Sequence, residues 1–258
     1  MGERNIRLTL GYDGTDFLGW QIQKQGRTVQ GEIEKALARM HGHSVRVTAA
    51  GRTDTGVHAT GQVANFFTDI DSIPSRTYYR ALNSYLPRDI RVVTSCEAPD
   101  TFSARKSARA RIYNYHLCSL DICLPHIARY SLHVRRRLEI GQLNRFASVL
   151  VGEHDFSAFA GSRDTNESKV RAVFSSSFFP QGYCIVYRIV ADSFLYKMVR
   201  SIVGTILYFT ENNKRENDLT ELLVSCNRNG AGPTAPAKGL FLDKVLYERE
   251  EDYFERPL

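Results

Sequence analysis

One short segment, residues 51–59, brings together three side chains able to do chemistry: Arg52, Asp54 and His58. Glycines at positions 51, 56 and 61 surround them, and glycine permits positive φ angles and the close approach of a partner. The flanking residues, 45–49 and 63–67, have the apolar alternation of β-strands, so we expect a sheet to anchor the segment. A loop of this kind on a rigid support is a typical position for a reactive group.

Asp54 is the first candidate for that group. A carboxylate is ionised at neutral pH, and it can act as a nucleophile or a base without prior activation. The competing interpretation is an Asx-turn over Asp54, Thr55 and Gly56, because aspartate also favours turns. His58 could join Asp54 in a metal site, but no third ligand stands at a recognisable spacing, which favours a structural histidine.

Arg200 is the candidate cation. It lies in residues 194–207, a predicted helix that is apolar on nearly every face and is therefore expected to be buried. A buried guanidinium requires a carboxylate partner. In a structural interpretation that partner is Asp192. In the functional interpretation it is Asp54, which a nearby cation would keep ionised and oriented.

Tyr113 and Tyr115 share one face of a predicted strand, in which they alternate with Arg109 and Arg111. Most tyrosines with this spacing belong to a core. The functional interpretation is a ring on which an unstacked base rests, beside cations that bind its phosphates. Arg52 could likewise contact phosphate or fill the gap that a flipped base leaves.

Charge and composition narrow the class of protein. The chain has 258 residues, 43% of them hydrophobic, and a net charge of +6. Its cations cluster in residues 102–137, which suggests a polyanionic partner, although a solvated face is the alternative. The start of the chain lacks the apolar core of a signal peptide and the longest apolar run, residues 202–209, is too short for a membrane span. We therefore expect a cytoplasmic protein without membrane contact.

The five cysteines are expected to be reduced core thiols, since their number is odd and no C-x-x-C spacing occurs. Nothing in the pattern indicates a zinc site or a disulfide framework.

The order of predicted elements indicates the fold. Strand and helix patterns over residues 6–95 follow the order βαββαβ, with a helix from Thr28 to Gly42 and another from about Ser75 that Pro87 ends. A similar order recurs from Ser107, with helices at 140–151 and 194–209. This predicts an α+β protein of two tandem ferredoxin-like, RRM-like units whose antiparallel sheets lie side by side around a central cleft that binds RNA. The expected domains are residues 1–104, with the Asp54 loop, and 105–258, with the Tyr113 strand and the Arg200 helix.

Six blocks in the same order resemble the tRNA pseudouridine synthase A family over almost the whole chain. The first is LGYDGT with GWQIQ and TVQ (residues 10–15, 19–23 and 28–30), and the second is GRTDTGVHA at 51–59. FSAR at 102–105 leads into Ala108, Arg111, Tyr113 and Tyr115, and GEHDFSAF follows at 152–159. The last two blocks are FLYKMVR at 194–200 and GPTAPAKGL at 232–240.

The resemblance implies an activity and roles for these positions. The family isomerises uridine to pseudouridine in the anticodon stem-loop of tRNA, at positions 38, 39 and 40, without a metal or organic cofactor and as a homodimer. Asp54 would be the catalytic aspartate, Tyr113 would stack under the uracil and remove the final C5 proton, and Arg200 would pair with Asp54. Four further residues would bind substrate, with Arg52 also assisting base extrusion: Arg52, Arg105, Arg111 and Leu240. The C-terminal domain would carry the dimer interface.

Two departures concern RNA docking rather than the catalytic blocks. Ser103 stands where the family often has histidine, and Arg135, Arg136 and Arg137 have no counterpart. Two rival functions remain open at this point. The first is a non-catalytic RNA-binding module, which would not need Asp54; the lack of a clear RNP block in this sequence counts against it. A metal-dependent nuclease would use Asp13, Asp54 and His58 and would lose activity with a chelator.

Overall fold

The computed structural model describes residues 3–247 and divides into two compact units. The first comprises residues up to Arg111 together with the described residues from Leu242 on, and the second comprises Ile112–Phe241. The first unit thus extends beyond the expected division at residue 104, because residues 246 and 247 bond to it. Arg109 N–H donates to the Leu246 carbonyl at 2.8 Å, and the Tyr247 hydroxyl donates to the Ala104 carbonyl at 2.7 Å.

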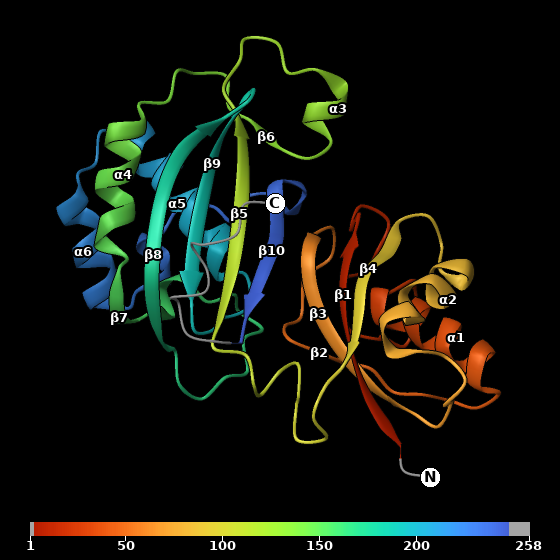
Figure 1. Ribbon diagram of the computed structural model, residues 1–258. Coiled ribbons are helices and arrows are strands. Elements are labelled where there is room, and N and C mark those ends of the chain that lie inside the picture. The colour runs from red at the N-terminus through yellow and green to blue at the C-terminus, as the bar shows by residue number, and fades with distance from the viewer. Residues whose placement is uncertain (1–2, 248–258) are drawn as a thin grey trace. The chain divides into compact units, whose positions relative to one another are not determined.

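The sheet of the first unit is built around β1 (Arg4–Tyr12), which pairs antiparallel with β3 (His58–Thr68) on one side and β4 (Ile90–Glu97) on the other (Figure 1). The short β2 (Thr48–Ala49) pairs antiparallel with β3. Side chains alternate along β1, and Ile6, Leu8 and Leu10 are fully buried. The alternation of apolar and other residues in the sequence therefore determines which face of β1 packs into the core.

Two helices cover this sheet on one face (Figure 1). The predicted helix after Thr28 is confirmed as α1 (Val29–His41): the Thr28 hydroxyl accepts the Gly31 N–H, and Gly42 ends the helix at φ 75°. The second, α2 (Tyr78–Tyr85), follows a 3₁₀ turn at Ser75–Thr77 and ends before Pro87, as expected. β3 begins directly after the loop that carries Asp54, so this unit positions the candidate carboxylate.

The second unit contains the strand order β5 (Ala110–Cys118), β9 (Cys184–Ala191), β8 (Val170–Gln181) and β7 (Gly152–Asp155). β8 pairs antiparallel with both β9 and β7, while the two-residue β6 (Leu132–His133) pairs parallel with β5. The molecule is thus a mixed α+β protein with mostly antiparallel pairing. The strand β7 and the elements between β5 and α4 were not expected, because they are too short to give a periodic signal.

The helices of the second unit are α3 (Pro125–Ala128), α4 (Ile140–Val149), α5 (Met198–Glu211) and α6 (Glu216–Ser225). Three 3₁₀ turns accompany them, at Ser157–Phe159, Arg228–Gly230 and Ala237–Gly239, and β10 (Leu240–Leu246) follows the last. α5 begins four residues later than its apolar pattern predicts, because Lys197 adopts a left-handed conformation at φ 62°. Within residues 3–247, no helix has the length and apolar composition that crossing a bilayer requires.

The cysteines are free thiols, but not all of them belong to the core. Cys118 is buried, whereas Cys96 and Cys226 are exposed. The prediction of core positions was wrong for these two, because Cys96 takes an exposed position of β4 and Cys226 follows the last turn of α6.

Candidate functional site

The loop between β2 and β3 holds Asp54 in a turn whose backbone is fixed on both sides. The Asp54 carbonyl accepts the Val57 N–H at 3.1 Å, which closes the turn. Thr53 is buried, and its hydroxyl bonds the Tyr12 hydroxyl at 2.8 Å. Burial raises the pKa of Tyr12, so this phenol stays neutral and remains available for that bond. Asp54 itself is half-buried, so its carboxyl is held near the surface by a rigid frame.

Residues 13–20, which follow β1, pack against this loop and form the wall beside it. Trp20 N–H donates to the Thr53 carbonyl at 3.0 Å, and Gly56 N–H donates to the Phe17 carbonyl at 3.3 Å. Gly14 lies so close to Val57 that a Cβ would stand 2.0 Å from its carbonyl oxygen. Gly19 has φ 94°, and a Cβ there would meet the Thr53 carbonyl at 2.5 Å. Only glycine allows the two segments to approach this closely.

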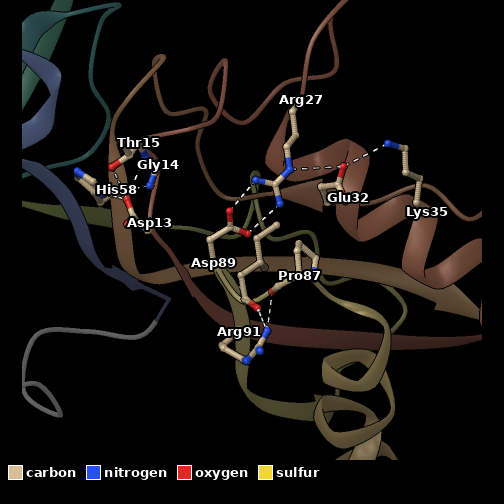
Figure 2. A network of polar contacts seen from close by, with 11 residues as sticks. Asp13, Gly14, Thr15, Arg27, Glu32, Lys35, His58, Pro87, Asp89 and Arg91 are labelled. Carbon is tan, nitrogen blue, oxygen red and sulfur yellow. Dashed lines mark hydrogen bonds and ion pairs between the residues drawn. The ribbon is translucent and has the colours of Figure 1, made fainter.

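His58 is a buried structural residue at the start of β3, with 1% of its surface exposed. Its Nδ1 accepts the Gly14 N–H at 3.0 Å and lies 3.2 Å from Asp13 Oδ1 (Figure 2). It therefore ties β3 to residues 13–15. Over the described part of the chain, no group of three or more His, Cys, Asp or Glu side chains could hold a metal ion. The histidine instead supports the wall that faces Asp54.

The four arginines near this loop differ in environment. Arg52, Arg105 and Arg109 are exposed to solvent. Arg111 is half-buried and donates to three backbone carbonyls, those of Ala50, Arg105 and Ala108, at 2.9, 3.0 and 3.2 Å. Because Ala50 immediately precedes the Asp54 loop, Arg111 joins the base of that loop to residues 105–108.

In the second unit, Tyr113 and Tyr115 point to the same face of β5 and both are buried. Tyr113, 8% exposed, packs edge-to-face against Phe194 with ring centroids 5.0 Å apart. Tyr115 is fully buried, and its hydroxyl donates to the Pro236 carbonyl at 2.8 Å. Burial raises the pKa of Tyr115, an effect that the positive charge of Arg200 partly offsets. Both tyrosines are thus buried, Tyr115 completely and Tyr113 with 8% of its surface exposed.

Arg200 lies in the first turn of α5 and is half-buried. Its Nε donates to the Ala235 carbonyl at 2.8 Å, and the Ala235 N–H donates back to the Arg200 carbonyl at 3.0 Å. This reciprocal pair fixes the loop of residues 232–239 against the helix. Leu240, at the end of that loop, is 5% exposed. Of the predicted residues, Arg200 thus fixes the loop of residues 232–239, and Leu240 directly follows that loop.

Asp192 has a local role in the same unit. Its Oδ1 accepts the Ala172 N–H at 3.3 Å and also the Ser193 N–H. The carboxylate thus fixes the end of β9 to β8 and shapes the turn that leads toward α5.

Asp164 was not singled out in the sequence, yet its side chain is 1% exposed. Its carboxylate accepts hydrogen bonds from the Lys169 ammonium and the Tyr196 N–H, both at 2.6 Å, and from the Asn166 N–H at 3.0 Å. Burial by itself would raise its pKa, but these hydrogen bonds outweigh that effect and lower the pKa to about 2. No periodicity marks such a residue, because its partners lie in another segment of the chain.

The arginine run at 135–137 has separate local partners. Arg136 Nη2 donates to the Leu207 carbonyl at 2.7 Å and to the Thr210 hydroxyl at 3.2 Å, near the C-terminal end of α5. A cation is favourable at that end of a helix. Arg137 is exposed and lies 3.0 Å from Glu139. For Arg136 at least, the charge stabilises a helix end.

Comparison with known proteins matches the chain to one family model, described as tRNA pseudouridine synthase, over residues 10–105 and 146–248. A relative from Treponema denticola named tRNA pseudouridine synthase A is 44% identical over 99% of this chain and 96% of its own length. Proteins of the same name from Brachyspira hyodysenteriae and Thermoanaerobacter sp. are each 41% identical over 95% of this chain, and 99% and 100% of their own lengths are covered.

Among solved structures, a crystal structure of a Cbf5–Nop10–Gar1 complex is similar at a TM-score of 0.34 and 11% identity, over 92% of this chain and 57% of that chain. A likeness at this level carries no conclusion about fold or function.

Proposed function

Since the chain belongs to the tRNA pseudouridine synthase family, we propose that Asp54 is the residue on which its reaction depends. The enzyme isomerises uridine to pseudouridine in tRNA. In that reaction the C1′–N1 bond breaks, the uracil turns, and a C1′–C5 bond forms while C5 loses its proton and N1 gains one. We propose the anticodon stem-loop, at positions 38, 39 and 40, as the place of modification.

The observation that carries the proposal is the way in which the Asp54 turn is held. Detached uracil must stay in place while the sugar reacts, so the catalytic group needs a fixed position. The Asp54 turn meets this need through the Thr53 and Gly56 backbone bonds to residues 17–20 and through the glycines that let the segments touch. Because the Asp54 carboxylate is half-buried, it can reach an extruded nucleotide and still keep a defined orientation.

We propose four further roles for residues of the sequence blocks. Tyr113 supports the uracil and takes the C5 proton; the fixed packing of its ring against Phe194, with 8% of its surface exposed, supports this role. Arg200 is the cation that keeps the catalytic aspartate ionised. Arg52 and Arg105 are exposed and suited to phosphate contacts. Arg111 and Leu240 act by shaping the loops beside the substrate.

The finer fold and the assembly belong to the same proposal. The order β1, α1, β2, β3, α2, β4 and the order β5, α4, β8, β9, α5, β10 each support a ferredoxin-like unit, and thus a tandem pair. We further propose a homodimer that acts in the cytoplasm, where its tRNA substrate is found.

Replacement of Asp54 by asparagine tests the proposal. Asp54→Asn should abolish tritium release from C5-labelled uridine in tRNA, because the amide is neither a nucleophile nor a base, and it should leave tRNA binding intact. Asp100→Asn is the control, since Asp100 is an exposed carboxylate of the same unit. Undiminished release by Asp54→Asn would remove Asp54 from the mechanism. Loss of tRNA binding together with release would leave Asp54 with a binding role instead.

A further inference from the structure

A two-point ion pair joins Arg27 and Asp89, next to the segment of residues 13–20 that bonds to the Asp54 loop. Arg27 precedes α1 and Asp89 precedes β4, so the pair joins segments far apart in the sequence. The guanidinium donates through Nη1 and Nη2 to the two carboxylate oxygens, at 2.6 and 2.9 Å (Figure 2). This two-point geometry is available to arginine but not to lysine. The Asp89 hydrogen bond raises the pKa of Arg27, in keeping with a permanent charge.

Each member of the pair also holds residues 13–18. The Arg27 guanidinium lies over the Phe17 ring, 4.2 Å from its centroid, and the Arg27 carbonyl accepts the Leu18 N–H at 2.9 Å. The Asp89 carbonyl accepts the Asp13 N–H at 3.0 Å. The backbone carbonyls of the two paired residues therefore hold residues 13–18 near both ends, and the side-chain ion pair links these two anchoring points.

Residues 13–20 in turn hold the Asp54 turn. Phe17 accepts the Gly56 N–H, and Trp20 donates to Thr53, so the residues on both sides of the Asp54–Thr55 step are bonded to this segment. Phe17 is 1% exposed and cannot move without disturbing this contact. From these contacts we propose that Arg27 and Asp89 are positioning residues, which place the Asp54 carboxyl for reaction by clamping residues 13–20 against its loop. The inference rests on the proposed role of Asp54.

The pair has a matched control in the same unit. Arg4, at the other end of β1, pairs with Glu97 at 3.3 Å and donates to the carbonyls of Ile70 and Ile73. Its side chain is 20% exposed, against 34% for Arg27. Arg4→Met should therefore cost at least as much thermal stability as Arg27→Met without touching the segment beside Asp54.

The experiment compares Arg27→Met, Arg27→Lys, Asp89→Asn and Arg4→Met by single-turnover rate, KM for tRNA and Tm. We expect Arg27→Met to lower the rate about tenfold or more with KM unchanged, since a small displacement of a reacting group is enough for such a loss. Arg27→Lys should restore part of the rate, because it keeps the charge but not the two-point bond. Arg4→Met should lower Tm and leave the rate unchanged. The double variant Arg27→Met/Asp89→Asn should lose no more than Arg27→Met alone.

Three results would overturn the proposal. The first is a full rate in Arg27→Met. The second is equal rate losses in Arg27→Met and Arg4→Met, which would reduce the effect to general stability. The third is a raised KM with a shallower salt dependence of tRNA binding, which would make Arg27 a phosphate contact. Asp54→Asn is assayed alongside. If it keeps its activity, the proposed function fails; if it is inactive while Arg27→Met is fully active, only the clamp fails.

Discussion

Asp164→Asn is expected to destabilise the second unit at neutral pH through the loss of one buried charge. The Asp164 side chain is 1% exposed and its pKa is lowered from 3.8 to about 2. That difference corresponds to about 2 kcal/mol of folding free energy when the carboxyl is ionised. Removing one member of a buried pair can cost about 3–5 kcal/mol, but that range applies when the remaining charge is stranded. Lys169 is 22% exposed and can reach water, so we expect the lower figure.

The pH dependence identifies the charge as the cause. Because the folded-state pKa lies below the unfolded-state value, the stabilisation is complete above about pH 5 and is lost as the pH falls toward 2. At pH 3 about 1 kcal/mol of the difference between wild type and Asp164→Asn should remain. Equilibrium urea unfolding at pH 7, 5 and 3, followed by circular dichroism, measures this difference directly.

The control is Asp218→Asn, which removes a carboxylate that pairs with Lys214 on the surface of α6. Its side chain is 32% exposed, so its loss of stability should be smaller than that of Asp164→Asn. Equal stabilities of wild type and Asp164→Asn at pH 7 would refute the reasoning. A difference that stays constant down to pH 3 would also refute it, because it would come from packing rather than from charge.

Two further substitutions test the frames around the candidate residues. Tyr113→Phe keeps the contact with Phe194, so it should bind tRNA and break the C1′–N1 bond but stall before loss of the C5 proton. A fully active variant in the tritium assay would leave the ring a stacking role only. Gly14→Ala should cost about 2 kcal/mol or more in urea unfolding, because its Cβ would overlap the Val57 carbonyl. Gly51→Ala, in the Asp54 loop, is the control, since its Cβ would meet nothing within 4 Å, and equal effects of the two would contradict the close approach.

The elements that the sequence predicted well are those with local signals. The limits of α1 follow from the Thr28 cap and the left-handed Gly42, both of which act within one helical turn. The alternation of β1 likewise appears in the buried positions Ile6, Leu8 and Leu10. In each case the residues that determine the structure are neighbours in the chain, so reading the chain in order is sufficient.

The contacts that sequence reasoning missed are long-range. Asp164 bonds Tyr196, and Arg27 bonds Asp89; in each case the partners stand in different elements, and neither carboxylate belongs to an apolar pattern. The run at 135–137 read as a charged surface, yet Arg136 binds the end of α5. A charged residue shows its partner only when the fold brings the partner to it, which is why the sequence offered Asp54 as a candidate but did not indicate the residues that hold its loop.

The late start of α5 matters for Arg200. Its apolar pattern begins at Phe194, but the Tyr196 N–H is bonded to Asp164 and Lys197 takes a left-handed conformation, which costs a residue other than glycine about 1–2 kcal/mol. A hydrogen bond to a charged carboxylate contributes a similar amount, about 1.5–3 kcal/mol, and can offset that cost. The helix therefore begins at Met198, and Arg200 lies in its first turn, where the helix dipole disfavours a cation. A cation at this end of a helix calls for a reason other than helix stability. The bond from the Arg200 Nε to the Ala235 carbonyl is one such reason, and the proposed pairing with a reactive carboxylate would be a second.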